Sequence, residues 1–122
     1  MSGSDETKAL ARTYLESWQA RDFDRLRSVL ADDVTFHGVL GVAAGADECI
    51  AGLRGMAENV MTDLDIQVMV ADGHDVLTWF DLHTATTEPL PTVNWSHVEN
   101  GRIARIRVTF DPRPLFAAQD TS

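Results

Sequence analysis

Apolar positions in the first third of the chain recur with the period of a helix. Leu10, Tyr14 and Trp18 lie four residues apart, so they form one stripe on a helix from about Glu6 to Ala20. The same periodicity returns in ARDFDRLRSVLADD, residues 20–33, and predicts a short second helix. Two consecutive helices therefore open the chain.

Capping residues and a change of period divide the next segment. Asp22 is suited to accept the first free N–H groups of the second helix. Asp47 is suited to the same role in a third helix, expected from about Glu48 to Met61. Between these helices, DVTFHG (residues 33–38) predicts a short strand, and the Gly- and Ala-rich GVLGVAAGAD (38–47) predicts a loop.

From Leu64 onward the apolar period shortens to two, which is typical of β-strands. Asn100 and Gly101 lie between two β-compatible runs, a combination that favours a hairpin turn. Pro112 and Pro114 end the last strand, because proline has no N–H to donate to a ladder. We expect a four-stranded antiparallel meander within segments 65–73, 75–86 and 92–111.

The order of these elements predicts an α+β fold in which a curved antiparallel sheet packs on the N-terminal helices. In the last strand apolar and basic side chains alternate, so the apolar row should face the helices. That row consists of Ala104, Ile106, Val108 and Phe110. One domain is expected over residues 6–116, with flexible termini at 1–5 and 117–122.

Charge and composition narrow the range of partners. The 122 residues carry a net charge of −9, which disfavours binding to nucleic acid or to anionic membranes. No apolar run is long enough to span a bilayer, and no secretory signal is visible. The single cysteine, Cys49, cannot form an internal disulfide, which favours a reducing, cytoplasmic location. A small molecule or another protein remains as partner.

The segment LTWFDLHTA, residues 77–85, combines a strand pattern with two polar side chains. Asp81 and His83 are two residues apart and therefore share one face. In a pocket, desolvation would raise the pKa of the aspartate and make it a general acid or base, with the histidine as its neighbour. The alternative is an exposed aspartate at a sheet edge, paired with an arginine.

Metal and cofactor chemistry find no support in the sequence. The histidines and the cysteine show neither HxxxH nor CxxC spacing, and the glycines do not form a phosphate-binding loop. His37, at the end of the first predicted strand, could act as a base or lie at the rim of a pocket. We therefore expect a protein without metal or cofactor.

Two long segments resemble the nuclear transport factor 2-like superfamily, in its SnoaL-like branch. They are YLESWQARDFDRLRSVLADDVTFHG (14–38) and VENGRIARIRVTFDPRPL (98–115). The resemblance implies a cone-shaped fold with a pocket between helices and sheet, and often a dimer through the outer sheet face. The same scaffold carries isomerases, cyclases, epoxide hydrolases and non-catalytic binders, so it implies fold more strongly than activity.

The ketosteroid isomerase relatives match this chain in part. Their oxyanion-donating tyrosine corresponds to Tyr14, and their second donor falls at Asn94, whose amide could also donate. Their general base falls at Gly38, which has no side chain to accept a proton. This departure places the isomerase reaction in doubt.

The limonene epoxide hydrolase relatives use two aspartates and an arginine. One aspartate position corresponds to Asp81, whereas the arginine falls at Trp79 and the second aspartate at Val108. From the two groups of relatives, the resemblance implies one pocket-facing acid together with neutral hydrogen-bond donors. The predicted catalytic residues are Asp81, His83, Tyr14 and Asn94. The predicted pocket lining is Trp18, His37, Met56, Val60, Trp79, Ile106, Val108 and Phe110.

The leading hypothesis is a small SnoaL-like enzyme without cofactor. It would act by acid–base chemistry, as an isomerase, cyclase or epoxide hydrolase, on an apolar small molecule. The alternative is a non-catalytic binding module, or a dimeric interaction module, of the same fold. A homodimer is expected through outward-facing Trp95, His97, Arg105 and Arg107.

Overall fold

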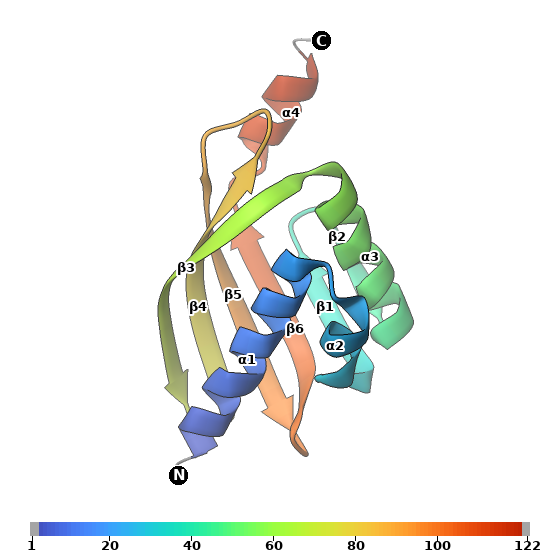
Figure 1. Ribbon diagram of the computed structural model, residues 1–122, viewed down its shortest axis with the longest axis vertical. Coiled ribbons are helices and arrows are strands. Elements are labelled where there is room, and N and C mark those ends of the chain that lie inside the picture. The colour runs from blue at the N-terminus through green and yellow to red at the C-terminus, as the bar shows by residue number, and fades with distance from the viewer. Residues whose placement is uncertain (1–2, 121–122) are drawn as a thin grey trace.

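The computed structural model describes residues 3–120 and has a six-stranded sheet that is covered on one side by the helices from the first half of the chain (Figure 1). The helices are α1 (Gly3–Ala20), α2 (Phe23–Ser28), α3 (Ala46–Asn59) and the short α4 (Arg113–Asp120). The strands are β1 (Leu30–Gly38), β2 (Gly41–Ala44), β3 (Met61–Asp72), β4 (Asp75–Thr84), β5 (Leu90–Glu99) and β6 (Arg102–Phe110). The predicted α+β class is confirmed.

The sheet is mixed, which corrects the purely antiparallel sheet expected from the sequence. Its order is β2-β1-β6-β5-β4-β3, and the last four strands form the predicted meander. However, β1 pairs with β6 in parallel, with Phe36 beside Ile106. The N-terminal strand thus joins the sheet next to the C-terminal one, and a pairing across so many residues leaves no local signal in the sequence.

Local signals set some boundaries and miss others. Asp22 caps α2 as predicted, because its side chain accepts a hydrogen bond from the Arg25 N–H at 3.2 Å. Asp47 does not cap α3: the N-cap is Gly45, at φ +93°, and Asp47 lies in the first turn. The predicted loop at 38–47 contains β2, which is held by its pairing with β1.

The two chain ends are more helical than expected. Residues 3–5 belong to α1 and residues 117–120 to α4, whereas 1–2 and 121–122 of the predicted flexible termini lie outside the described residues. The β5–β6 hairpin has the predicted turn, with positive φ at both Asn100 (53°) and Gly101 (74°).

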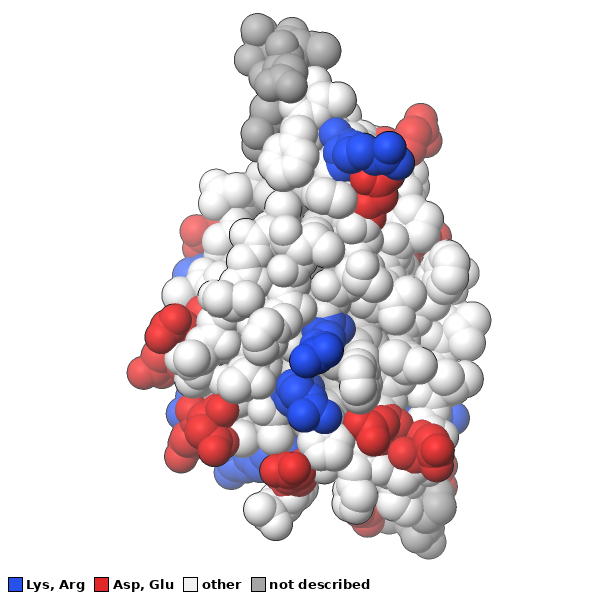
Figure 2. Space-filling model, turned by 180° about the vertical axis from the view of Figure 1, so that it is seen from behind, with Lys and Arg blue, Asp and Glu red and all other residues white. Residues whose placement is uncertain are grey.

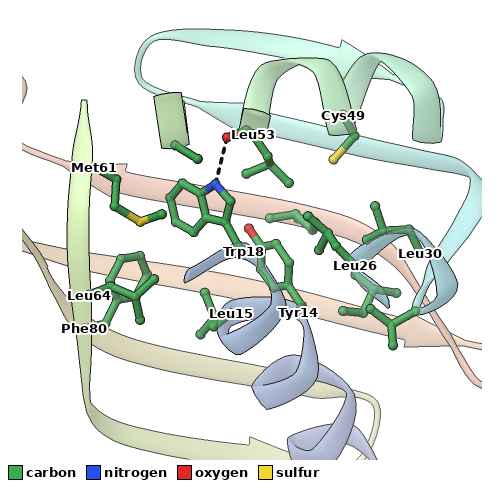
Figure 3. Packing of buried hydrophobic residues seen from close by; sticks show 14 of the residues in the cluster. Tyr14, Leu15, Trp18, Leu26, Leu30, Cys49, Leu53, Met61, Leu64 and Phe80 are labelled. Atoms are coloured by element: carbon green, nitrogen blue, oxygen red, sulfur yellow. Dashed lines mark hydrogen bonds between the residues drawn. The ribbon is translucent and has the colours of Figure 1, made fainter. Parts of the chain in front are cut away.

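The core fills the space between the helices and the inner face of the sheet (Figure 3). Trp18 is central to it: its indole Nε1 donates to the Leu53 carbonyl at 2.8 Å and so connects α1 to α3. The indole also meets Phe80 edge to face, with ring centroids 6.5 Å apart. Within residues 3–120, no helix combines the length and apolarity needed to cross a membrane.

Candidate functional site

A small cavity lies between α1, α3 and the inner face of the sheet. Its volume is about 70 Å³, and its surface is almost entirely apolar. We call it the inner cavity. It is lined by Tyr14, Trp18, Phe36, Gly38, Val39, Leu40, Gly41, Leu53, Met56, Phe80, Leu82, Thr92, Asn94, Val108 and Phe110. Residues from both ends of the chain therefore share one wall.

The polar part of this wall is a short chain of buried hydrogen bonds. The Tyr14 hydroxyl donates to Asn94 Oδ1 at 3.1 Å, and Asn94 Nδ2 donates to the Ser96 hydroxyl at 2.8 Å. Nearby, the Thr92 hydroxyl donates to the Leu90 carbonyl at 3.0 Å. Tyr14 from α1 and Asn94 from β5 thus meet across the core and satisfy each other's hydrogen-bonding groups, as buried polar side chains must.

Burial controls the protonation of the tyrosine. Desolvation raises the pKa of Tyr14 well above its ordinary value, and the nearby Cys49 raises it further. The phenol therefore stays neutral at physiological pH, as a hydrogen-bonding group and not as a phenolate.

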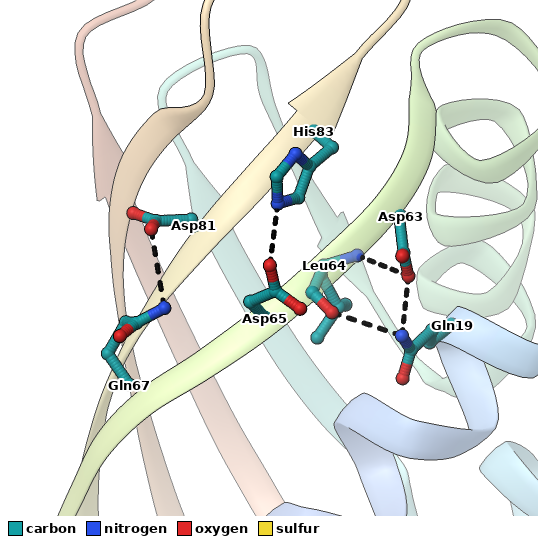
Figure 4. A network of polar contacts seen from close by, with 7 residues as sticks. All are labelled: Gln19, Asp63, Leu64, Asp65, Gln67, Asp81 and His83. Carbon is teal, nitrogen blue, oxygen red and sulfur yellow. Dashed lines mark hydrogen bonds and ion pairs between the residues drawn. The ribbon is translucent and has the colours of Figure 1, made fainter.

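Asp81 and His83 lie on the opposite face of the sheet from the inner cavity, so their expected pocket-facing position is wrong. Phe80 and Leu82, their neighbours in β4, point inward and line the cavity. On the outer face, His83 Nε2 lies 2.8 Å from Asp65 Oδ2, and Gln67 Nε2 donates to Asp81 at 3.3 Å (Figure 4).

The reason for the error is the composition of β4. Both of its faces carry apolar residues, so alternation alone does not show which face is inside. Val76 and Phe80 belong to the inner face, whereas Leu77 and Trp79 are exposed on the outer one.

Six of the twelve predicted site residues line the inner cavity; besides Asp81 and His83, four others do not. Those that do are Tyr14, Trp18, Met56, Asn94, Val108 and Phe110. Trp79 is half exposed on the outer face, and His37 is exposed beside Arg107 of β6. Val60 ends α3, and Ile106 is buried in the core; neither reaches the cavity, so the predicted lining is wrong at these four positions.

Most of the chain matches one family of known proteins. The family model described as "SnoaL-like domain" matches residues 11–106. The chain belongs to the SnoaL-like domain family. Among curated proteins, none matches the sequence.

Solved structures share this fold over most of the SnoaL-like chain. A protein from Kribbella flavida superposes with a TM-score of 0.87 at 25% identity, covering 93% of each chain. An epoxide hydrolase from M. tuberculosis, described as LEH-like, has a TM-score of 0.78 at 26% identity and covers 94% of this chain and 90% of its own. A candidate ketosteroid isomerase from Kribbella flavida reaches 0.81 at 22% identity, covering 91% and 82%.

Several lining residues of this SnoaL-like domain were not predicted from the sequence. Thr92 lies two positions before Asn94, and Phe36 lies two positions before Gly38, so strand alternation could have found both. The turn residues Val39 and Leu40, and Gly41 at the start of β2, carried no such signal, because this segment was expected to be a loop and a loop has no period. They enter the site through the β1–β2 pairing.

The outer face of the sheet holds the residues predicted for a dimer. Trp95 lies under two guanidinium groups, with Arg105 at 5.5 Å and Arg107 at 5.8 Å from its ring centroid. Its indole N–H donates to Asp75, which also lies 2.8 Å from His97. Figure 2 shows basic side chains in the middle of a largely uncharged surface, with acidic groups toward its edge.

Exposed apolar side chains on this face come from β3 and β4. Each is about half exposed: Val68, Val70, Leu77 and Trp79. We call these four residues the outer apolar patch. Among the described residues, no group of three or more His, Cys, Asp or Glu side chains is arranged to hold a metal ion.

Proposed function

We propose that this SnoaL-like domain binds a neutral, apolar small molecule that carries one hydroxyl group. The observation that carries this proposal is the chemistry of the inner cavity. Among the described residues that line it, none has a carboxylate or an imidazole, and the polar side chains are Tyr14, Asn94 and Thr92. Such a wall can bind and orient a ligand, but it offers no group that exchanges protons near pH 7.

The hydrogen bonds within the wall favour a hydroxyl on the ligand. The Tyr14 and Thr92 protons are already donated to Asn94 Oδ1 and the Leu90 carbonyl. What the two hydroxyl oxygens still offer is acceptor capacity, and an amide nitrogen has a second proton to donate. An alcohol or phenol, which both donates and accepts, can use these groups without breaking the existing bonds.

Two positions support binding over acid–base catalysis. Gly38, where the resemblance to ketosteroid isomerases places the general base, lines the cavity without a side chain. Asp81, which corresponds to an aspartate of the epoxide hydrolase relatives, faces away from it and contacts Gln67. We therefore propose a binding pocket in the position expected for the family, without the group that would transfer protons there.

The test compares two ligands of similar shape, 4-methylphenol and 1,4-dimethylbenzene, by titration calorimetry. Tyr14→Phe should weaken the phenol about fivefold, because a net hydrogen bond is worth about 1 kcal/mol, and should leave the hydrocarbon unchanged. The control Asp81→Asn should bind both as the natural chain does. Equal effects of Tyr14→Phe on the two ligands, or a turnover reaction abolished by Asp81→Asn, would contradict the proposal.

We also propose that two copies of the chain associate through the outer sheet face. The support is the outer apolar patch, whose four side chains lie next to one another on paired strands, with Val68 opposite Trp79 and Val70 opposite Leu77. Apolar clusters of this kind are typical of protein interfaces. Trp95, with its two arginines, lies on the neighbouring strand and extends the same surface.

A further inference from the structure

We infer that the inner cavity continues into a second hollow and that the two together bind one elongated ligand. The inference rests on the proposed function. The second hollow, here the outer groove, lies along α3 and β2 and has a volume of about 320 Å³. It is lined by Phe36, Leu40, Gly41, Val42, Ala43, Glu48, Cys49, Ala51, Gly52, Leu53 and Met56.

The inner cavity and the outer groove share one partition. The residues that line both are Phe36, Leu40, Gly41, Leu53 and Met56. Because these five residues line both hollows, the two hollows lie on opposite sides of the same residues. Leu40 lies in the β1–β2 turn, outside the paired strands, and Gly41 follows it in the last pair of the β1–β2 ladder, opposite Gly38. One hollow can therefore reach the other beside Leu40 without opening the ladder.

The side chains of this partition can move. Leu40 is 48% exposed, so rotation of its side chain disturbs little packing. Met56 is only partly buried, and its unbranched thioether adapts readily to a new neighbour. Gly41 contributes no side chain at all, and a Cβ at this position would meet nothing within 4 Å. The partition therefore contains two side chains that can move, Leu40 and Met56, beside Phe36 and the buried Leu53.

The volumes of the two hollows indicate that a drug-sized ligand needs both of them. Clefts that hold drug-sized ligands measure about 300–1,000 Å³. The inner cavity, at about 70 Å³, is far below that range, whereas the outer groove adds about 320 Å³ beside it. A ligand whose hydroxyl reaches Tyr14 can extend past Leu40 and Met56 along α3.

Charge and polarity define the chemistry of the extended part. The groove is mostly apolar, and Glu48 is the one charged residue among its described lining residues. Cys49 offers no charge near neutrality, because burial raises the pKa of its thiol to about 11. A carboxylate or phosphate tail would meet Glu48 and a chain of net charge −9, whereas a neutral aliphatic chain meets only apolar surface. The expected ligand is a hydroxyl-bearing ring or short head with a linear neutral aliphatic tail.

The experiment measures how affinity changes with tail length, using 4-methylphenol, 4-butylphenol and 4-octylphenol in calorimetric titrations. Gly52→Leu places a side chain in the outer groove, and Gly55→Leu is its matched control. Both glycines are in α3 with open space where a Cβ would lie, but only Gly52 lines the groove. Both substitutions replace glycine with a better helix former, so both variants should fold, as circular dichroism and melting would verify.

For the natural chain and Gly55→Leu, affinity should rise by up to about fourfold per buried methylene from methyl to octyl. In Gly52→Leu the gain should stop near butyl, with 4-methylphenol bound as before. Failure of affinity to rise with tail length in the natural chain, while 4-methylphenol still binds, would overturn this inference and leave the proposed function intact. Equal losses in the two variants would also overturn it. Absence of binding by every phenol would overturn both proposals.

Discussion

The buried thiol of Cys49 shows how one residue couples stability to pH. It is 2% exposed in the core, and desolvation raises its pKa from 9.0 to about 11. Above pH 9 the unfolded chain loses this proton while the folded chain keeps it. The free energy of unfolding should therefore fall between pH 9 and pH 11, by up to about 1.4 kcal/mol per pH unit from this group.

Urea unfolding at pH 8, 9 and 10 measures this slope, and Cys49→Ala is the matched variant. The alanine chain should be less stable at pH 8, because the substitution leaves a cavity, but its stability should fall less between pH 9 and pH 10. Tyr14, whose pKa is also raised by burial, adds to the loss of stability from about pH 10 upward, in both chains. Parallel curves for the two chains would show that Cys49 does not cause the alkaline loss.

At the scale of single residues, the sequence indicated candidate residues for the site but did not always show which face of a strand they occupy. Tyr14 and Asn94 were expected in the cavity wall and line it; the helical stripe indicated Tyr14, and the resemblance to the family indicated both. Asp81 was expected there too but lies on the other face, since either face of β4 could have been the inner one. A single strand contains its own alternation, but the helices that cover one of its faces lie elsewhere in the chain.

At the scale of the elements, one buried hydrogen bond connects α1 directly to α3. Trp18→Phe removes the indole N–H, so the Leu53 carbonyl in the core loses this donor. Because the Leu53 carbonyl lies within α3 and keeps its place in the helical ladder, the variant should lose about 0.5–1.5 kcal/mol of unfolding free energy, the usual net value of one hydrogen bond. Equilibrium denaturation in urea gives the value.

Trp95→Phe is the comparison, because it also removes one indole hydrogen bond. Its acceptor, Asp75, has a side chain 43% exposed in the single chain, so at dilutions where the chain is monomeric water can replace the lost donor. The loss of stability should be smaller than for Trp18→Phe. A larger loss at Trp95 would mean that the α1–α3 hydrogen bond is not the stronger structural link.

Element boundaries were predictable where a local signal exists and uncertain where pairing decides. The stripe of α1 and the Asp22 cap of α2 are local, and both were found. By contrast, β2 is a strand because it pairs with β1, and its sequence, rich in Gly and Ala, gives no strand signal. The inner cavity and outer groove depend on that pairing, so their common partition could not be foreseen.

For the molecule as a whole, the outer apolar patch predicts association of two copies. Trp79→Arg should shift the chain toward the monomer, because it places a charge in the middle of exposed apolar surface. Light scattering coupled to size exclusion, over a range of concentrations, measures the mass. The expected result is twice the monomer mass for the natural chain and the monomer mass for the variant.

Phe116→Arg is the control for that experiment. Phe116 is 49% exposed, close to Trp79 at 50%, but it lies on α4, beyond the end of the sheet (Figure 1). This variant should keep the mass of the natural chain. A monomeric natural chain, or dissociation by Phe116→Arg and not by Trp79→Arg, would refute an interface on the outer sheet face.

The parallel pairing of β1 with β6 has a consequence for how the cavity wall is completed. Phe36 and Gly38 of β1 form the cavity wall together with Val108 and Phe110 of β6, so the wall is complete only when the last strand arrives. A chain that lacks β6 would therefore lack Val108 and Phe110 from the cavity wall, and the proposed ligand should not bind to it.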